Sequence, residues 1–357
     1  MAVTVVYGTR PETRKLRTLL AGMKGRGWAV QLISTDQHPD LTAHLHDDPV
    51  FAGTIHLGMP NLGGLDPFEY GRLLAEQLTD VIRGQVVLVQ GDTATAWAGA
   101  RAATNLGLPV YHVEAGVRTG DLENPWPEER FRWGIDFGAD AGCCATPGNQ
   151  ALLAAEGFDI TRFPVTGNPG IDALLADQPP VSTRWRHVLV TLHRRESFGE
   201  RLTGIVRALG QWAAAHPDTP IFWPVHPNPA VTAAIQSAGG LPSSVVLLPP
   251  LAPRPFLTLL AHAHAVLTDS GGVQEEAAAL GIPCVVARQV TDRPESVAEG
   301  LAVLAPDPDR LPTALTLASR PGGLRACPSP VFGDGLATPR ILDHLASLYP
   351  DFLFPTD

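Results

Sequence analysis

The chain has 357 residues and a hydrophobic content of 45%, which together favour two domains, each with its own core. Its formal net charge of −10 argues against a protein that coats nucleic acid or binds an anionic membrane. No apolar run is long enough to cross a bilayer without Gly, Pro or a charged residue.

The cysteines and the N-terminus indicate the compartment. The four cysteines, Cys143, Cys144, Cys284 and Cys327, have neither CxxC spacing nor a histidine at zinc-finger distance. We therefore expect buried thiols in a reducing environment and no metal. The N-terminus has no basic region of the kind that begins a signal peptide, so we expect a cytoplasmic protein.

Strand-like runs alternate with helix-like runs, which is typical of βαβ units around a parallel sheet. In the first part of the chain we expect strands at 3–7, 29–34, 86–90, 110–113 and 141–145. We expect helices at about 11–25, 68–83, 93–105 and 149–156. Turn-forming residues cluster at 164–170, and this cluster predicts a hinge.

The same alternation resumes after that segment. We expect strands at 187–191, 221–225, 245–248, 265–268 and 283–287, with helices at 171–175, 200–215, 230–237, 256–263 and 273–280. The sequence therefore predicts an α/β fold of two Rossmann-like, doubly wound domains facing a cleft. The N-terminal domain would span 1–168 and the C-terminal domain 169–337, with a final helix in 338–357 packing back on the first domain.

Three carboxylates follow strands of the predicted first domain. Asp92 comes after the strand at 86–90, Glu114 comes after the strand at 110–113, and Glu128 lies shortly beyond in a Pro-Trp-Pro-Glu-Glu run. The carboxyl ends of the strands line the ligand crevice of an open α/β sheet. Any one of these acids alone would more simply cap a helix or pair with a nearby arginine. Together they predict acid/base chemistry on one substrate.

A glycine-rich turn joins a strand to a helix in the predicted second domain. Backbone N–H groups at such a helix start bind phosphate oxygens, helped by the helix dipole, and the turn here is Ser270-Gly271-Gly272. Glu276 lies one helical turn further on, where it could accept from a ribose hydroxyl. An ordinary turn with Ser270 as the N-cap is the alternative. Arg293, which follows the next strand, favours the phosphate site.

Basic side chains follow the first strand of each domain. Arg10 and Lys15 follow the strand at 3–7, and His193 follows the strand at 187–191, where it could neutralise or protonate a leaving phosphate. A single histidine is more often structural, and we expect that role for His226. This division fits a nucleotide-linked sugar, with the diphosphate held by the second domain and the sugar acted on by the first.

Two common nucleotide motifs are absent from the sequence. No GxGxxG follows the first strand and no GxxxxGK[ST] occurs, so neither NAD binding nor a P-loop ATPase is expected.

Motifs follow one another along nearly the whole chain, in the order GTRPE, GDTATA, HVEAGVRTGDLENPWPEE, TGNPGIDALL, HRRESF, WPVHPNP, LTDSGGVQEEAAALGIPCVV, TDRPE and FGDG. Together they resemble the motifs of the non-hydrolysing UDP-N-acetylglucosamine 2-epimerases. The resemblance implies two Rossmann-like domains in the glycosyltransferase-B arrangement and usually a homodimer. It also implies reversible conversion of UDP-GlcNAc to UDP-ManNAc without a metal or a nicotinamide cofactor.

The resemblance further implies elimination of UDP to give 2-acetamidoglucal, followed by re-addition with inverted stereochemistry at C2. Asp92, Glu114 and Glu128 would be the acid/base and cation-stabilising set, and His193 would assist the leaving diphosphate. The implied substrate-binding residues are Arg10, Lys15, Arg132, Phe256, Ser270, Gly271, Gly272, Glu276 and Arg293, with Phe256 stacking on uracil.

The chain departs from the family pattern at three places. Phe131-Arg132 stands where Asn-Arg is frequent, and Leu251 stands where a Gln is usual. Many bacterial members bind a second nucleotide sugar through a QHR-type segment, which is Gln37-His38-Pro39-Asp40 here, and the loop at 58–67 has no Arg. We therefore expect little or no requirement for UDP-GlcNAc as an activator.

Three other functions fit parts of the pattern. A hydrolysing epimerase would release UDP and free N-acetylmannosamine, and a nucleotide-sugar glycosyltransferase would share the fold. A catalytically inactive nucleotide-sugar sensor is the non-enzymatic alternative. The HVEAG and PWPEE motifs favour the non-hydrolysing reaction over the first, and the presence of all three acids and His193 argues against the last.

Overall fold

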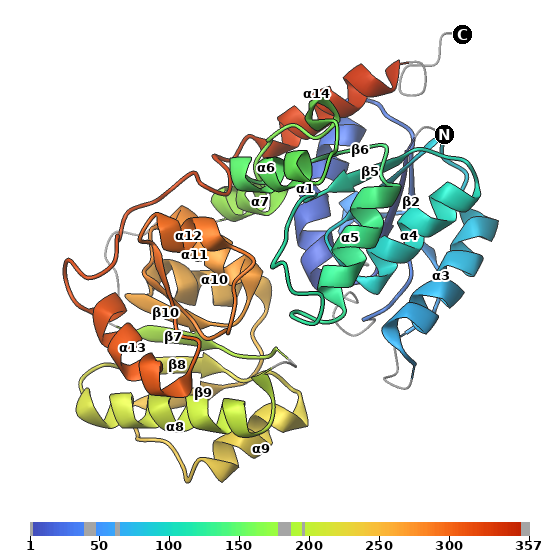
Figure 1. Ribbon diagram of the computed structural model, residues 1–357. Helices are drawn as coiled ribbons and strands as arrows, with labels where there is room; N and C mark the ends of the chain where they lie inside the picture. Colours follow the sequence, from blue (N-terminus) through green and yellow to red (C-terminus); the bar gives the residue numbers. More distant parts are fainter. Residues whose placement is uncertain (1–2, 39–47, 61–64, 178–186, 195–196, 351–357) are drawn as a thin grey trace. The chain divides into compact units, whose positions relative to one another are not determined.

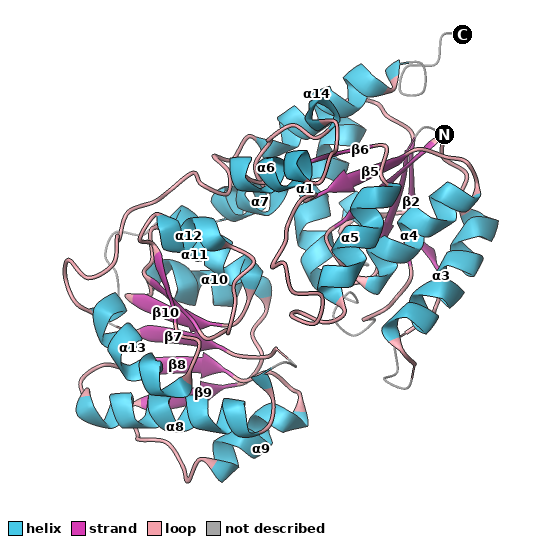
Figure 2. Ribbon diagram, in the orientation of Figure 1, coloured by secondary structure: helices cyan, strands magenta, loops and turns pink. Residues whose placement is uncertain are grey.

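The computed structural model describes residues 3–38, 48–60, 65–177, 187–194 and 197–350. The chain forms two compact units, and each contains one six-stranded parallel sheet (Figure 1). The first unit comprises Met1–Ala173 and Gly333–Asp357, and the second comprises Leu174–Phe332. Figure 2 shows the strands of each sheet lying between layers of helices. Among the described residues, no helix combines the length and apolar character that a membrane crossing requires.

The sheet of the first unit has the strand order β3-β2-β1-β4-β5-β6. Its strands are β1 (Val3–Tyr7), β2 (Val30–Ser34), β3 (Ile55–His56), β4 (Val86–Gln90), β5 (Val110–Val113) and β6 (Ala141–Cys143). The strand order reverses between β1 and β4, and ligands of doubly wound sheets bind outside the carboxyl ends of the strands at such a point. The central strands are buried along their whole length, as expected for a parallel sheet covered on both faces.

Helices cover both faces of this sheet. They are α1 (Arg10–Gly25), α3 (Pro67–Val81), α4 (Ala94–Asn105), α5 (Glu128–Gly138), α6 (Pro147–Ala155), the first half of α7 (Pro169–Asp177) and α14 (Ala337–Leu348). Alternate strand side chains point to opposite faces. Val5 and Leu88 therefore pack with α1 and α14, whereas Val6 and Val89 pack with α3, α4 and α5. A Cβ on Gly99 of α4 would lie 2.9 Å from Val89 Cγ1, so the small residues of this helix let it sit close to the sheet.

The last helix belongs to the first unit, although it follows the whole second unit in sequence. The Asp172 carboxylate accepts hydrogen bonds from the backbone N–H groups of Ala337 (3.1 Å) and Thr338 (2.6 Å) at the start of α14. The Arg26 guanidinium lies 2.7 Å from the Asp343 carboxylate. The Asp172 contacts thus hold α14 against α7, and the Arg26–Asp343 pair and the shared apolar core hold it against α1 (Figure 1).

The second unit repeats the architecture with the strand order β12-β11-β10-β7-β8-β9. Its strands are β7 (Val188–Thr191), β8 (Ile221–Pro224), β9 (Val245–Leu248), β10 (Ala265–Thr268), β11 (Cys284–Val286) and β12 (Ala302–Leu304). Its main helices are α8 (Glu200–Ala215), α9 (Pro229–Ser237), α10 (Pro253–His262), α11 (Gly271–Leu280), α12 (Pro294–Ala298) and α13 (Leu311–Ser319). One face packs on α8, α9 and α13, and the other packs on α10 and α11.

The predicted fold class is confirmed, and the predicted strands and helices recur with ends shifted by a few residues. Five elements were not predicted from the sequence: β3, α5, β12, α12 and α13. The most consequential omission is α5, because it begins at Glu128 and carries several residues of the candidate site.

Candidate active site

Glu114 follows β5 in a backbone conformation that non-glycine residues rarely adopt. Its φ is 79°, and the turn is held because the N–H groups of Glu114 and Ala115 both donate to the Cys143 carbonyl, at 3.1 and 2.9 Å. The Glu114 carboxylate forms an ion pair with the Lys15 ammonium, and the same oxygen accepts from Gln90 Nε2 at 2.5 Å. Such strained residues cluster at functional sites.

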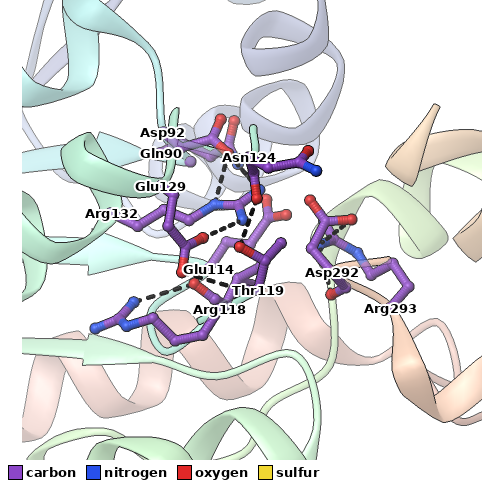
Figure 3. A network of polar contacts seen from close by, with 12 residues as sticks. Gln90, Asp92, Glu114, Arg118, Thr119, Asn124, Glu129, Arg132, Asp292 and Arg293 are labelled. Atoms are coloured by element: carbon purple, nitrogen blue, oxygen red, sulfur yellow. Dashed lines mark hydrogen bonds and ion pairs between the residues drawn. The ribbon is translucent and has the colours of Figure 1, made fainter. Parts of the chain in front are cut away.

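Asp92 follows the neighbouring strand, β4, and pairs with an arginine from α5. Arg132 Nε and Nη2 lie 2.8 and 2.7 Å from Asp92 Oδ2 (Figure 3). The Arg132 side chain is 5% exposed, whereas that of Asp92 is 29% exposed. The arginine is therefore buried behind a carboxylate that solvent or a ligand can reach.

Glu128 is the first residue of α5 and is half-buried. Negative charge is favoured at a helix N-terminus because the backbone N–H groups there point outward. Residues four apart lie on the same face of a helix, so Glu128 is on the same side of α5 as Arg132.

A buried ionic network joins the two turns that carry Asp92 and Glu114. His112 Nε2 lies 2.8 Å from the carbonyl oxygen of Gly91, and Nδ1 lies 2.5 Å from Asp136 Oδ1. Asp136 Oδ2 accepts from the backbone N–H of Gly116 at 3.1 Å and from Arg118 Nη1 at 2.7 Å. Burial alone would raise the pKa of Asp136, but His112 and Arg118 outweigh it and hold that pKa below its usual value.

Glu12 holds the turn after β1. It is 1% exposed, and its Oε2 accepts from the backbone N–H groups of Gly8 (2.9 Å) and Thr9 (2.7 Å). Its Oε1 accepts from the Thr93 hydroxyl at 2.6 Å, which connects this turn to the start of α4 beside Asp92. Burial raises the pKa of Glu12, although these hydrogen bonds oppose the shift. Arg10, half-buried, begins the helix that this turn leads into.

His193 in the second unit is oriented by a buried aspartate. Asp269 Oδ2 accepts from the backbone N–H groups of His193 and Arg194, both at 2.9 Å, and Oδ1 lies 3.2 Å from His193 Nδ1. Burial would raise the pKa of Asp269, but the His193 contacts and the two N–H groups lower it. The His193 ring also stacks on His226, with centroids 5.7 Å apart. Arg195 and Glu196 lie outside the described residues.

The glycine-rich turn begins α11. Ser270 is at the N-cap position without a capping hydrogen bond from its side chain, so the structure does not support the simple role of a serine cap. A Cβ on Gly271 would lie 3.6 Å from Arg293 Cζ, which places the guanidinium beside the turn. Arg293 is buried and donates to the Glu275 carboxylate. Gly272, Glu276 and Phe256 are half-buried on α11 and α10.

The structure thus brings some of the predicted residues together within each unit. In the first unit Lys15 pairs with Glu114 and Arg132 pairs with Asp92, at the ends of the neighbouring strands β5 and β4, and in the second unit Arg293 lies beside Gly271 of the glycine-rich turn. Across the described part of the chain, no group of three or more His, Cys, Asp or Glu side chains is arranged to hold a metal ion.

The comparisons with known proteins identify the family. A profile of the UDP-N-acetylglucosamine 2-epimerase family matches residues 26–346. The chain belongs to this family.

Individual relatives agree with this UDP-N-acetylglucosamine 2-epimerase family assignment. The UDP-N-acetylglucosamine 2-epimerase of Salmonella typhimurium is 37% identical over 84% of this chain and 85% of its own length. The Escherichia coli K12 enzyme of that name is 35% identical over 97% of this chain and 98% of its own. The predicted family is therefore confirmed.

A solved structure of the family has the same fold. The crystal structure of UDP-GlcNAc 2-epimerase from Neisseria meningitidis bound to UDP-GlcNAc is 30% identical, with a TM-score of 0.89. The match covers 97% of this chain and 100% of that one.

Several residues that contact the predicted site residues were not predicted from the sequence. Gln90, His112, Glu129, Asp136 and Asp269 all contact a predicted site residue or its turn but were not singled out. His112, Glu129 and Asp269 lie inside the motifs that carried the family resemblance, so their position was a usable signal. Asp136 lies outside those motifs. It contacts His112 because of the face of α5 on which it lies, and that face depends on where the helix begins.

Proposed function

We propose that the protein interconverts UDP-GlcNAc and UDP-ManNAc by elimination and re-addition of UDP, without hydrolysis. The observation that carries this proposal is that Asp92 and Glu114 follow neighbouring strands and that each is paired with a cation of its own, Arg132 or Lys15. Two carboxylates held in this way can serve one small substrate at two different atoms.

The reaction needs more than one carboxylate because the C2 proton of the sugar is only weakly acidic and is hard to remove. That proton becomes removable as the C1–O bond loosens and positive charge develops at the anomeric carbon. A carboxylate stabilises the charge, and a second carboxylate takes the proton as the C1–O electron pair leaves with UDP. The UDP oxygen then adds back to C1 of the glucal, and a proton is delivered to the opposite face of C2.

We assign the acid/base and charge-stabilising roles to Asp92, Glu114 and Glu128, and assistance to the leaving diphosphate to His193. The position of His193 supports its role, because its Nδ1 lies 3.2 Å from Asp269 Oδ1 and the side chain is 39% exposed. The proposed substrate-binding residues are Arg10, Lys15, Arg132, Phe256, Ser270, Gly271, Gly272, Glu276 and Arg293. Lys15 and Arg132 contact carboxylates of the site, so we expect them to orient those acids as well as to bind the substrate.

Product analysis by NMR tests the proposal against its alternatives. The non-hydrolysing reaction gives UDP-ManNAc in equilibrium with UDP-GlcNAc. Free N-acetylmannosamine with UDP would instead identify a hydrolysing epimerase. Turnover only after an acceptor is added would identify a glycosyltransferase, and binding without any turnover would identify a sensor.

We also propose that the protein is a cytoplasmic homodimer. The family resemblance implies this oligomeric state, and Leu106 at the end of α4 and Phe137 at the end of α5 are apolar side chains that are 40% and 62% exposed. All four cysteines are free thiols, which fits a reducing compartment. Light scattering tests the oligomeric state, and a monomer at micromolar concentration would contradict it.

Finally, we propose that UDP-GlcNAc is not required as an activator. The Gln37 side chain, part of the segment that replaces QHR, accepts from the Thr95 hydroxyl at 2.8 Å and is thereby held against α4. Pro39 and Asp40 lie outside the described residues. The measurement is initial rate against UDP-GlcNAc and against UDP-ManNAc. Strongly sigmoidal kinetics that disappear when Gln37 and His38 are changed to Ala would refute the proposal.

A further inference from the structure

Glu129 is a fully buried carboxylate immediately next to the proposed catalytic residue Glu128. Its side chain is 0% exposed. Its Oε1 accepts from the backbone N–H groups of Thr119 (2.9 Å) and Gly120 (3.1 Å), and its Oε2 accepts from Arg132 Nη1 (2.9 Å; Figure 3). Three donors from the protein itself thus occupy both oxygens, and the group is closed to a substrate.

Arg132 is the link between Glu129 and Asp92. Its guanidinium is a planar fork, with Nη1 directed at Glu129 and both Nε and Nη2 directed at Asp92 Oδ2. Because the guanidinium contacts Glu129 on one edge and Asp92 on the other, Glu129 fixes the orientation of the guanidinium plane. That orientation in turn fixes the position of the Asp92 carboxylate. The charges alternate from Glu129 through Arg132 to Asp92. The two carboxylates therefore offset the free-energy cost of burying the Arg132 side chain, which is 5% exposed.

Glu129 also closes the loop that leads into α5. The Thr119 hydroxyl donates to the carbonyl oxygen of Asn124 at 2.6 Å, so the turn bound by Glu129 is tied to the residues just before Glu128. The backbone N–H of Glu129 donates to the carbonyl oxygen of Pro125 at 2.9 Å. One buried side chain therefore fixes both the arginine behind Asp92 and the segment that presents Glu128.

We propose that Glu129 is a positioning residue of the reaction, which acts on Asp92 through Arg132 without touching the substrate. This inference rests on the proposed function, because it assumes that the placement of Asp92 limits turnover. The central variant is Glu129→Gln, which keeps the shape and one acceptor but turns an amide N–H₂ toward Arg132. The matched control is Glu123→Gln, since Glu123 is an exposed glutamate of the same loop that pairs with Arg130.

We expect Glu129→Gln to lower kcat by about 10²-fold, the cost of a misplaced catalytic group, with KM for UDP-GlcNAc changed less than about threefold. The control should keep wild-type kcat. A double-mutant cycle with Asp92→Asn separates positioning from general structural support. In the Asp92→Asn background the second substitution should cost clearly less than in the wild-type background, because the part of its effect that passes through Arg132 to Asp92 is then already lost. Equal losses in both backgrounds, or wild-type kcat in Glu129→Gln, would overturn the inference.

Two further measurements keep the test decisive. If Glu129→Gln does not fold, Arg132→Lys takes its place, because lysine keeps the charge but cannot span both carboxylates; wild-type kcat in that variant would overturn the inference. If the wild type shows no epimerisation, the proposed function fails first, and the Arg132 Nε–H resonance then tests the linkage alone. Glu129→Gln and Asp92→Asn should each shift this resonance, and its insensitivity to Glu129→Gln would overturn the inference.

Discussion

The ammonium group of Lys15 pairs with the carboxylate of Glu114, a residue 99 positions further along the chain. The contact joins the helix after β1 to the turn after β5, and both side chains are mostly buried, at 15% and 8% exposed. Loss of either partner leaves a charge that little water can reach.

Replacement of Lys15 should therefore destabilise the folded protein as well as lower the rate of epimerisation. We expect Lys15→Met to lower the free energy of unfolding by about 3 kcal/mol, the low end of the range for breaking a buried pair. The double variant Lys15→Met/Glu114→Gln should recover most of this loss, because no uncompensated charge remains. Urea denaturation measures the unfolding free energy of both variants. A double variant less stable than Lys15→Met would contradict the account.

The three proposed acids should be needed for epimerisation but not for UDP binding. Asp92→Asn, Glu114→Gln and Glu128→Gln should each lower the epimerisation rate by a factor of about 10²–10⁴, the usual loss when one acid or base is removed. Calorimetric titration with UDP should still show binding in all three. Near-normal turnover in any one variant would remove that residue from the catalytic set.

These residues also show how far the sequence could lead. The short apolar strands alternating with helices predicted the sheets, and the acids that follow two of these strands predicted the region of the chemistry. The choice of Glu128 over Glu129 rested on the motif resemblance and not on a physical signal in the sequence, because two adjacent carboxylates differ only in the phase of the helix that carries them. That phase depends on where α5 begins, and the start of α5 follows from loop contacts such as the one between Glu129 and Thr119. The two-residue strand β3 offers too short a pattern to detect.

The lowered pKa of Asp136 predicts a specific pH dependence of stability. An aspartate in the unfolded chain has a pKa of about 3.9. Because the folded pKa is lower, the contribution of Asp136 to stability is fully present above about pH 4 and is lost as the pH falls through the folded pKa. The difference in unfolding free energy between the wild type and Asp136→Asn should thus be constant from pH 5 to 7 and shrink below pH 4.

The control for this experiment is Asp218→Asn, at an exposed position of the second unit. It should leave the unfolding free energy nearly unchanged across the same range. A difference between the wild type and Asp136→Asn that grows toward low pH would contradict the sign of the predicted linkage.

Two glycines with the same backbone conformation should respond differently to alanine. Gly116, after the Glu114 turn, has a φ of 76°, and a Cβ there would lie 2.4 Å from the carbonyl oxygen of Asn149. Gly107 has a φ of 67° with no atom within 4 Å of an added Cβ. We expect Gly107→Ala to cost about 1–2 kcal/mol from backbone strain alone and Gly116→Ala about 2–5 kcal/mol, because overpacking adds to that strain. Equal losses in denaturant unfolding would show that the Glu114 turn is not packed as described.

The proposed reaction makes its most direct prediction about one hydrogen atom of the substrate. The wild-type protein is incubated with UDP-GlcNAc in deuterium oxide, without an acceptor, and the C2 position is followed by proton NMR. We predict that the C2 proton signal disappears as UDP-ManNAc deuterated at C2 accumulates. UDP-ManNAc that retains hydrogen at C2, or bound UDP-GlcNAc that shows neither exchange nor epimerisation, would contradict elimination and re-addition at this site.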